Sequence, residues 1–430
     1  MHKVDLTAGP LAGAWRNNTI GTLYEFAKRA PGTSLRLSIG AEEILLIQDA
    51  ETTRHILRTN ARNYAKNYGG FLGLFGESRL TSDGVRWERL RDLSQPYIGA
   101  ARSADVVRVA NRSFVGAVQD LLDARDGEGR VDVEPAANRA AATVVSEVAL
   151  GFGAFDVAAT IEDFRAILRY GSRGHWNIGG AQVADSPAER ARFEAARANL
   201  QRRIRTVLQT AASGPAGLVS DIGAAESDGV DPVSEIASLL FAGFDTTSTA
   251  ISWGLFLLAA SPDLQSALRA DVRRVMGDGP LVPEALEALP QLAAFRNEVL
   301  RIFPPIPAIG RTALAVDRLG DEEVRAGQPV MISIIGLHHD PAHFAAPAQV
   351  RLARYPGGRL PRELTGHHLP FSDGHRICAG ARIANVELLA AFAILIDRLV
   401  FELADTRPLE FEWVASLRRR GGTHLRIRPA

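Results

Sequence analysis

The single cysteine of this 430-residue chain, Cys378, lies within a distinctive ten-residue segment. Phe371 stands seven residues before it, Gly374 four before, Arg376 two before, and Gly380 two after. Glycines let a backbone approach a flat ligand closely. The alanine-rich stretch that follows is expected to be a helix, whose N-terminal amides favour the thiolate form of a nearby cysteine. The segment therefore predicts a thiolate ligand for haem iron, against the alternative of a buried structural cysteine.

A second polar cluster interrupts the most apolar stretch of the chain, residues 236–260. Asp245 and Thr246 follow Ala242 and Gly243 near the middle of this stretch. Burying such groups costs free energy unless something pairs with them. An acid beside a hydroxyl in a small wet pocket is suited to proton delivery, and Gly243 would leave room for a ligand beside the backbone. The alternative is a helix–helix contact between small polar residues.

Both segments resemble sequence motifs of the cytochrome P450 family. Within that family, the chain looks like the bacterial-type soluble members. The cysteine segment matches the pattern Phe-x-x-Gly-x-Arg-x-Cys-x-Gly at every fixed position. The resemblance implies haem b (iron protoporphyrin IX) as cofactor, Cys378 as the ligand of the iron, and Gly380 beside it. It also implies that Phe371 packs against the cysteine and that Arg376 pairs with a haem propionate. Ser372 departs from the Gly that many members carry at that position.

Residues 242–246 match the oxygen-activation motif of that family, Ala/Gly-Gly-x-Asp/Glu-Thr, without a departure. The resemblance implies that Thr246 supplies the hydroxyl and Asp245 the acid that help to activate dioxygen. This pair argues against the peroxide-dependent relatives, which lack it.

Three further residues occupy positions where the family contacts the haem propionates. Trp87 and Arg91 match its Trp-x-x-x-Arg pattern, and Arg311 follows the proline-rich residues 303–307. Haem carboxylates that are removed from water need arginine donors nearby. Taken singly, each arginine could equally be a surface residue.

Glu298 and Arg301 are three residues apart and share one face of a predicted helix. Most pairs with this spacing lie on the surface and contribute little to stability. The resemblance implies instead a buried structural lock, completed by Arg354.

The resemblance also implies a substrate pocket, whose candidate residues are mostly apolar. They come from a first loop, the long helix, the segment after the Glu298 helix, and a C-terminal turn: Phe71, Leu72, Leu74, Leu239, Ala242, Ile306, Ala308, Ile309, Gly422 and Thr423. Such a pocket suits a small hydrophobic molecule held without an ion pair. The arginines at 418–420 could bind a carboxylate, but we expect a solvated charged loop there.

Composition places the chain among ordinary globular proteins, with 46% hydrophobic and 23% charged residues. Forty-nine basic residues balance 49 acidic ones, so no global field favours nucleic acid or an anionic membrane. One cysteine allows no intrachain disulfide. The apolar stretch carries Asp245 at its middle, where a lipid-facing charge is costly, so we expect a core helix. These features predict a soluble, cytoplasmic protein that binds neither nucleic acid nor membrane.

The hydrophobic pattern predicts a mainly α fold with small β-sheets (α+β), as in the cytochrome P450 fold, with haem between the long central helix and the helix after the cysteine. We expect residues 1–430 to form a single catalytic domain without a fused reductase. Residues 34–39 and 44–47 predict a hairpin around 40–41, and strands are expected at 330–335 and 425–427. Helices are expected at 50–59, 87–98, 103–122, 136–150, 187–210, 232–260, 262–275, 292–302 and 381–403.

The resemblance implies a monooxygenase that inserts one atom of O2 into a small hydrophobic substrate, by hydroxylation or epoxidation in natural-product or xenobiotic metabolism. Its electrons would come from a ferredoxin and a ferredoxin reductase. One alternative keeps the haem-thiolate site but catalyses oxidative coupling, dehydration or isomerisation without oxygen insertion. More remote alternatives are a non-catalytic haem sensor and a colourless hydrolase that uses Cys378 and His375.

Overall fold

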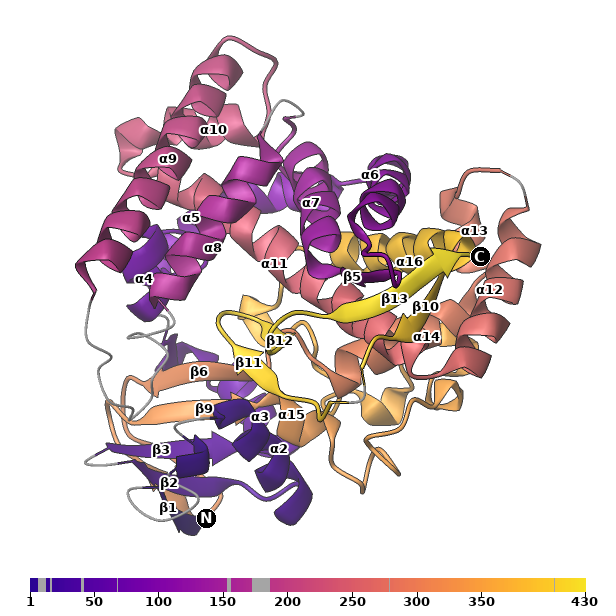
Figure 1. Cartoon of the computed structure of the whole chain (residues 1–430). Helices are drawn as coiled ribbons and strands as arrows, with labels where there is room; N and C mark the ends of the chain where they lie inside the picture. The colour runs from indigo at the N-terminus through magenta and orange to yellow at the C-terminus, as the bar shows by residue number, and fades with distance from the viewer. Residues whose placement is uncertain are drawn as a thin grey trace.

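The computed structural model describes residues 1–6, 13–15, 18–39, 42–67, 69–152, 156–171, 186–277, 279–405 and 407–430. Within these residues, long helices occupy most of the chain and the strands form small sheets (Figure 1). The predicted mainly α fold with small β-sheets is therefore confirmed.

The helices gather around α11, which runs through the centre of the molecule (Figure 1). The α-helices are α2 (Thr19–Arg29), α3 (Ala50–Arg54), α4 (Gly69–Phe75), α5 (Gly84–Ala100), α6 (Ser103–Ala124), α7 (Glu134–Val144), α8 (Val157–Gly171), α9 (Pro187–Ala212), α10 (Leu218–Ala224), α11 (Pro232–Ala259), α12 (Pro262–Met276), α13 (Pro283–Glu287), α14 (Pro290–Ile302), α15 (Ile334–His338) and α16 (Ala381–Arg398).

The largest sheet contains both N-terminal and later strands, in the order β1-β2-β3-β9-β6-β4. A second sheet has the order β10-β13-β5, and two hairpins, β7-β8 and β11-β12, stand alone. The strands are β1 (His2–Asp5), β2 (Leu35–Ile39), β3 (Glu42–Ile47), β4 (Tyr64–Lys66), β5 (Arg130–Asp132), β6 (Ala308–Ala313), β7 (Asp317–Leu319), β8 (Glu322–Val324), β9 (Pro329–Ser333), β10 (Leu399–Leu403), β11 (Phe411–Trp413), β12 (Leu417–Arg419) and β13 (His424–Pro429).

The predicted hairpin is present, because β2 and β3 pair antiparallel with Leu37 opposite Ile44. Its turn, residues 40–41, lies outside the described residues. In the same sheet, the antiparallel pairing of β4 with β6 places Lys66 directly opposite Arg311. This pairing of two cations becomes important at the site described below.

Helix α11 owes its start and its burial to local sequence. Asp231 caps the helix by accepting hydrogen bonds from the backbone N–H groups of Val233 and Ser234, at 3.1 and 3.2 Å, and Pro232 occupies the first turn. Apolar residues then surround the helix on nearly all sides, as is typical of a helix in a protein core. No helix among the described residues combines the length and the apolarity needed to cross a bilayer.

Three predicted helix boundaries differ from the structure, and so does one segment predicted as a loop, residues 68–76. The helix expected at 381–403 ends at Arg398, and β10 begins at Leu399 because that segment pairs with β13. The helices expected at 50–59 and 136–150 each end in a π-helical turn, η1 (His55–Thr59) and η3 (Val145–Ala149). The first loop, expected at 68–76, contains α4, whose phenylalanines pack into the core with Phe241 of α11. Tertiary contacts, which local patterns do not carry, decide each case.

Gly254 of α11 packs directly against Phe392 of α16, and this contact generates a prediction about stability. A Cβ atom at Gly254 would lie 2.3 Å from Cε1 of Phe392, a ring that is fully buried. We expect Gly254→Ala to destabilise the protein by about 2 kcal/mol, because overpacking a core forces neighbouring side chains to move. The midpoint of thermal unfolding, measured at equal cofactor loading, should fall by several degrees.

Gly116→Ala is the matched control for this change. Gly116 lies within α6, and a Cβ atom there would meet nothing within 4 Å. Its replacement should raise stability by up to about 1 kcal/mol through helix propensity alone. Equal effects of the two substitutions would contradict the packing argument.

Candidate active site

A cavity of about 330 Å³ is lined by both of the segments that the sequence marks out. Asp245 and Thr246 contribute from α11, and Cys378 contributes from the loop that precedes α16. The rest of the lining is largely apolar and includes Leu239, Ile309 and Ala415. The fold therefore brings the acid, the hydroxyl and the thiol to one interior space.

The cysteine loop closes on itself and points backbone amides at the sulfur. The N–H of Cys378 donates to the carbonyl oxygen of Phe371 at 2.9 Å. The N–H groups of Gly380 and Ala381, where α16 begins, donate toward the sulfur. Cys378 has accessible surface, but that surface faces the interior cavity. Burial raises the pKa of the thiol, and the two N–H groups with the nearby Arg79 act in the opposite direction.

The glycines of this loop have two different purposes. Gly374 has a φ of 72°, and a Cβ atom there would lie 1.8 Å from the carbonyl oxygen of Leu57, so it allows close packing against protein rather than against a ligand. Gly380 lines the cavity, and a Cβ atom there would meet nothing within 4 Å. Ser372 has a φ of 64°, a conformation that favours glycine, which explains why glycine is common at this position in the resembling family.

The polar residues of α11 differ in what they contact. The hydroxyl of Thr246 donates to the carbonyl oxygen of Ala242 at 3.1 Å and faces the cavity. Gly243 also lines the cavity, but a Cβ atom there would lie 2.3 Å from Cγ2 of Val145, so packing against η3 requires the glycine. Gly243 was expected to make room for a ligand, and it also makes room for the side chain of Val145.

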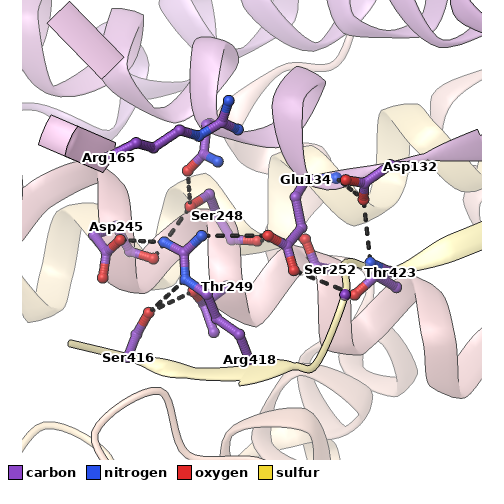
Figure 2. Close-up of polar contacts among 12 residues, drawn as sticks. Asp132, Glu134, Arg165, Asp245, Ser248, Thr249, Ser252, Ser416, Arg418 and Thr423 are labelled. Atoms are coloured by element: carbon purple, nitrogen blue, oxygen red, sulfur yellow. Dashed lines mark hydrogen bonds and ion pairs between the residues drawn. The ribbon is translucent and has the colours of Figure 1, made fainter. Parts of the chain in front are cut away.

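Asp245 is tied to an arginine that the sequence pattern did not single out (Figure 2). The Arg418 guanidinium on β12 donates to one carboxylate oxygen of Asp245, and also to Glu134 at 3.2 Å. The neighbouring Arg419 is buried and pairs with Asp405 at 2.9 Å, whereas Arg420 is exposed. The prediction of a solvated loop at 418–420 is therefore wrong for Arg418 and Arg419, because both side chains pair with carboxylates inside the fold.

Trp87, Arg311 and Arg376 all line the cavity. The guanidinium carbon of Arg376 lies 4.3 Å from the centre of the Trp87 ring, and its N–H groups donate to Asp83 and to the carbonyl oxygen of Ser82, at 3.0 and 2.8 Å. The structure thus brings together three of the residues expected to contact the haem carboxylates.

Arg91, the fourth of these residues, does not line the cavity. Its guanidinium lies 5.1 Å from the Trp87 ring and pairs with the exposed Asp92 at 2.6 Å. The structure therefore places this side chain against Trp87 but not in the cavity lining, and its contact with a propionate stays a prediction. Helix spacing fixed which face of α5 carries Arg91 but not the direction of its long side chain.

Two cations that sequence reasoning missed take part in this cavity. Lys66 of β4 and Arg79, which precedes α5, both line it. The ammonium of Lys66 donates to the carbonyl oxygen of Leu80 at 3.1 Å, and the Arg79 guanidinium donates to Ser94 and Gln95 of α5. No motif marks either residue. The rarity of lysine, found only at Lys3, Lys28 and Lys66, was the one available signal.

The cavity has the features that a haem requires. Burial and the neighbouring Arg376 and Arg311 hold the pKa of Lys66 well below its usual value, and Lys66 lies directly opposite Arg311 across two strands. Like charges in this arrangement repel each other, and the two carboxylates of a haem would relieve that repulsion. The thiol of Cys378 and the open surface at Gly380 complete a site of suitable chemistry.

Glu298, Arg301 and Arg354 also come together. The Glu298 and Arg301 side chains are fully buried and form two hydrogen bonds, at 2.6 and 3.0 Å, and Arg354 lies 3.5 Å from the same carboxylate. Arg301 donates further to the carbonyl oxygens of His338, Pro347 and Gln349. Because the buried Arg301 has this many partners, it holds the chain segment that leads toward the cysteine loop against α14.

The expected substrate residues divide into two groups. Six of them line the cavity: Phe71, Leu239, Ala242, Ile306, Ala308 and Ile309. Four do not line it: Leu72, Leu74, Gly422 and Thr423. Leu72 is exposed on α4, Leu74 packs in the core, and the turn at 422–423 folds back onto Asp132 of β5, so the structure does not bring these four residues to the cavity.

Comparisons with known proteins match part of the chain to one family model and to several relatives. A family model described as cytochrome P450 matches residues 230–424. Cytochrome P450 4X1 of Rattus norvegicus is 34% identical over 197 residues, which cover 45% of this chain and 39% of that protein. Taurochenodeoxycholic 6 alpha-hydroxylase of Sus scrofa is 30% identical over 203 residues, covering 46% and 39%. The chain thus spans about two fifths of the length of these relatives.

Two comparisons extend over most of the chain. Protein LUTEIN DEFICIENT 5, chloroplastic, of Arabidopsis thaliana is 24% identical over 418 residues, which cover 88% of this chain and 68% of that protein. The crystal structure of a cytochrome P450DA mutant heme domain superposes with a TM-score of 0.82 at 18% identity, covering 100% of this chain and 98% of that chain. These matches show the fold and indicate haem b as the cofactor.

Proposed function

Because this chain belongs to the cytochrome P450 family, we propose that it is a haem-thiolate monooxygenase acting on a small, mainly hydrophobic organic molecule. The observation that carries this proposal is the single cavity that holds Cys378, Thr246 and Asp245 within an apolar lining. We also propose that residues 1–430 act as one catalytic domain.

The proposed roles follow from chemistry. When bound, the haem supplies an iron that reduces dioxygen, so that one oxygen atom enters the substrate and the other leaves as water. Cys378 would hold the iron through its sulfur, and Trp87, Lys66, Arg311 and Arg376 would hold the carboxylates. The remaining groups, Thr246 and Asp245, would move protons, because a hydroxyl beside an acid can pass protons into a space closed to bulk water.

The substrate class rests on the cavity and on the relatives. Phe71, Phe241, Ile306 and Trp413 supply large apolar or aromatic surfaces to the lining. Pockets of this composition bind molecules with extended apolar surface. One relative is by its name a taurochenodeoxycholic 6 alpha-hydroxylase. We therefore favour hydroxylation, with epoxidation second, in natural-product or xenobiotic metabolism.

The proposed electron donors are a ferredoxin and its reductase, which follow from the sequence resemblance. Exposed arginines near the cysteine loop suit an acidic donor. The exposed Arg382 of α16 donates to the carbonyl oxygen of Gly99 at the end of α5, and the partly exposed Arg91 lies on that same helix. A cytoplasmic location is part of the same proposal.

Isotopic labelling tests the reaction. A compound library is first screened for molecules whose binding changes the spin state of the haem. A compound found in this way is then turned over under labelled dioxygen with surrogate redox partners. We expect one labelled oxygen atom in the product, measured by mass spectrometry. A product without label would favour coupling, dehydration or isomerisation, and an absence of any turnover would favour a haem sensor.

Replacement of the sulfur tests the proposed iron ligand. We expect Cys378→Ala to abolish the red-shifted absorption band of the reduced carbon monoxide complex, because that band requires a thiolate ligand. Far-ultraviolet circular dichroism should be unchanged, which shows that the fold is retained. Persistence of the band would exclude Cys378 as the ligand.

Replacement of the hydroxyl tests proton delivery. We expect Thr246→Ala to bind the same compound but to release several-fold more hydrogen peroxide per electron pair, measured against consumption of reduced nicotinamide. Thr143→Ala is the matched control, because Thr143 makes the same kind of hydrogen bond, to Arg139 at 2.9 Å, on α7 away from the cavity. An undiminished product yield in Thr246→Ala would count against its role.

A further inference from the structure

The acid of the proposed site is held by a residue from the far end of the chain. Arg418 has only 17% of its side chain exposed and lies between the carboxylates of Asp245 and Glu134 (Figure 2). The second carboxylate oxygen of Asp245 is buried and has no hydrogen-bond partner among the described residues. One oxygen of the acid is therefore fixed while the other stays available.

The hairpin that carries Arg418 is joined to α11 at three successive turns. Asp245, Thr249 and Trp253 are four residues apart, so they lie on one face of the helix. Asp245 binds Arg418, the hydroxyl of Thr249 lies 2.8 Å from that of Ser416, and the indole N–H of Trp253 donates to the carbonyl oxygen of Leu417 at 2.7 Å. The position of the hairpin along α11 is thus set by hydrogen bonds as well as by packing.

The same hairpin forms part of the cavity wall. Trp413 of β11 and Ala415 of the turn line the cavity, three to five residues before Arg418. A molecule in the cavity therefore contacts the hairpin whose arginine holds the acid. The hairpin contacts the cavity through Trp413 and Ala415 and binds Asp245 through Arg418. This two-stranded unit therefore connects the wall of the cavity with the acid.

More negative than positive side chains surround Arg418 and its partner Glu134. Asp245 from α11 and Glu134 from α7 contact it, Glu412 from β11 lies close to it, and Asp132 from β5 and Arg165 from α8 lie close to Glu134. Burial raises the pKa of Glu134, and the neighbouring Asp132 and Asp245 raise it further. Removal of Arg418 would leave buried carboxylates without their contacting cation, which is strongly unfavourable.

We propose that Arg418 is a positioning residue for the reaction: it fixes the orientation and the charge of Asp245 and links both to the hairpin that contacts the substrate. This inference rests on the proposed function of Asp245 as the proton-delivering acid. Arg418 itself exchanges no proton in this scheme, because a guanidinium stays protonated in proteins.

The electrostatic part is tested without turnover, on the haem-loaded protein. Arg418 lowers the pKa of Glu134 against the raising effect of burial, so without Arg418 the folded-state pKa of Glu134 rises further above its unfolded value, and stability is retained at low pH and lost as pH rises. We expect Arg418→Met to lower the unfolding midpoint slightly at about pH 5 and by about 5 °C more at about pH 8. The double variant with Asp245→Asn should lose part of this pH dependence, because Asp245 also raises the pKa of Glu134.

Arg420→Met is the matched control, since Arg420 follows the same hairpin, is exposed and lies 3.5 Å from Glu410. Its unfolding midpoint should follow that of the unchanged protein at every pH. A deficit in Arg418→Met that does not vary with pH, or that Asp245→Asn leaves unaltered, would overturn the proposal.

The catalytic part is tested with 7-ethoxycoumarin as probe substrate and 4-phenylimidazole as a probe of the haem pocket. We expect Arg418→Met to release several-fold more peroxide per electron pair, Arg418→Lys to recover part of the loss, and Arg420→Met to show none. Affinity for 4-phenylimidazole should change by less than about threefold, because the pocket itself remains.

Equal peroxide release by Arg418→Met and Arg420→Met would disprove the positioning role. Failure of the proposed function is distinguishable from this outcome. In that case the unchanged protein gives no labelled product, while the pH dependence of stability still reports on the Asp245–Arg418 pair.

Discussion

Asp245 lies halfway along a helix that is buried on nearly every side, so its charge must be met by a partner that the fold brings to it. That partner is Arg418, which comes from a C-terminal hairpin and is itself shared with Glu134. The pairing decides where the hairpin lies, and the hairpin in turn forms part of the cavity wall. One ion pair thereby connects the central helix, the end of the chain and the space where a substrate would bind.

On the other side of the cavity, several cations lie close together. Lys66 and Arg311 face each other across β4 and β6, and Arg79 and Arg376 line the same space. Such a cluster is unfavourable for an isolated chain and favourable around a dianionic cofactor. The molecule is thus prepared electrostatically for a haem, and cofactor binding should contribute to its folding stability as well as to its chemistry.

Several features could be predicted from the sequence because they depend on local chemistry. The Cys378 segment and the Asp245–Thr246 pair carry residue types whose spacing has a chemical purpose, and both line the cavity. The long apolar stretch around Asp245 was predicted as a core helix, and the described structure has α11 there. Alternation of apolar residues also predicted the β2–β3 hairpin, since a strand pattern is set by neighbours a few residues apart.

Other features were decided only by the tertiary structure. Lys66 and Arg79 belong to no motif, and they reach the cavity because β4 pairs with β6 and because α5 holds the Arg79 guanidinium. Arg91 has the expected spacing from Trp87 but does not line the cavity, since the direction of a long side chain depends on its surroundings. Arg418 stands in a run of three arginines that local composition cannot tell apart, and the buried carboxylates of α11 and α7 select it. The sequence by itself determined the reactive groups and the helix that carries the acid, whereas charge pairing over long chain separations determined which other residues meet them.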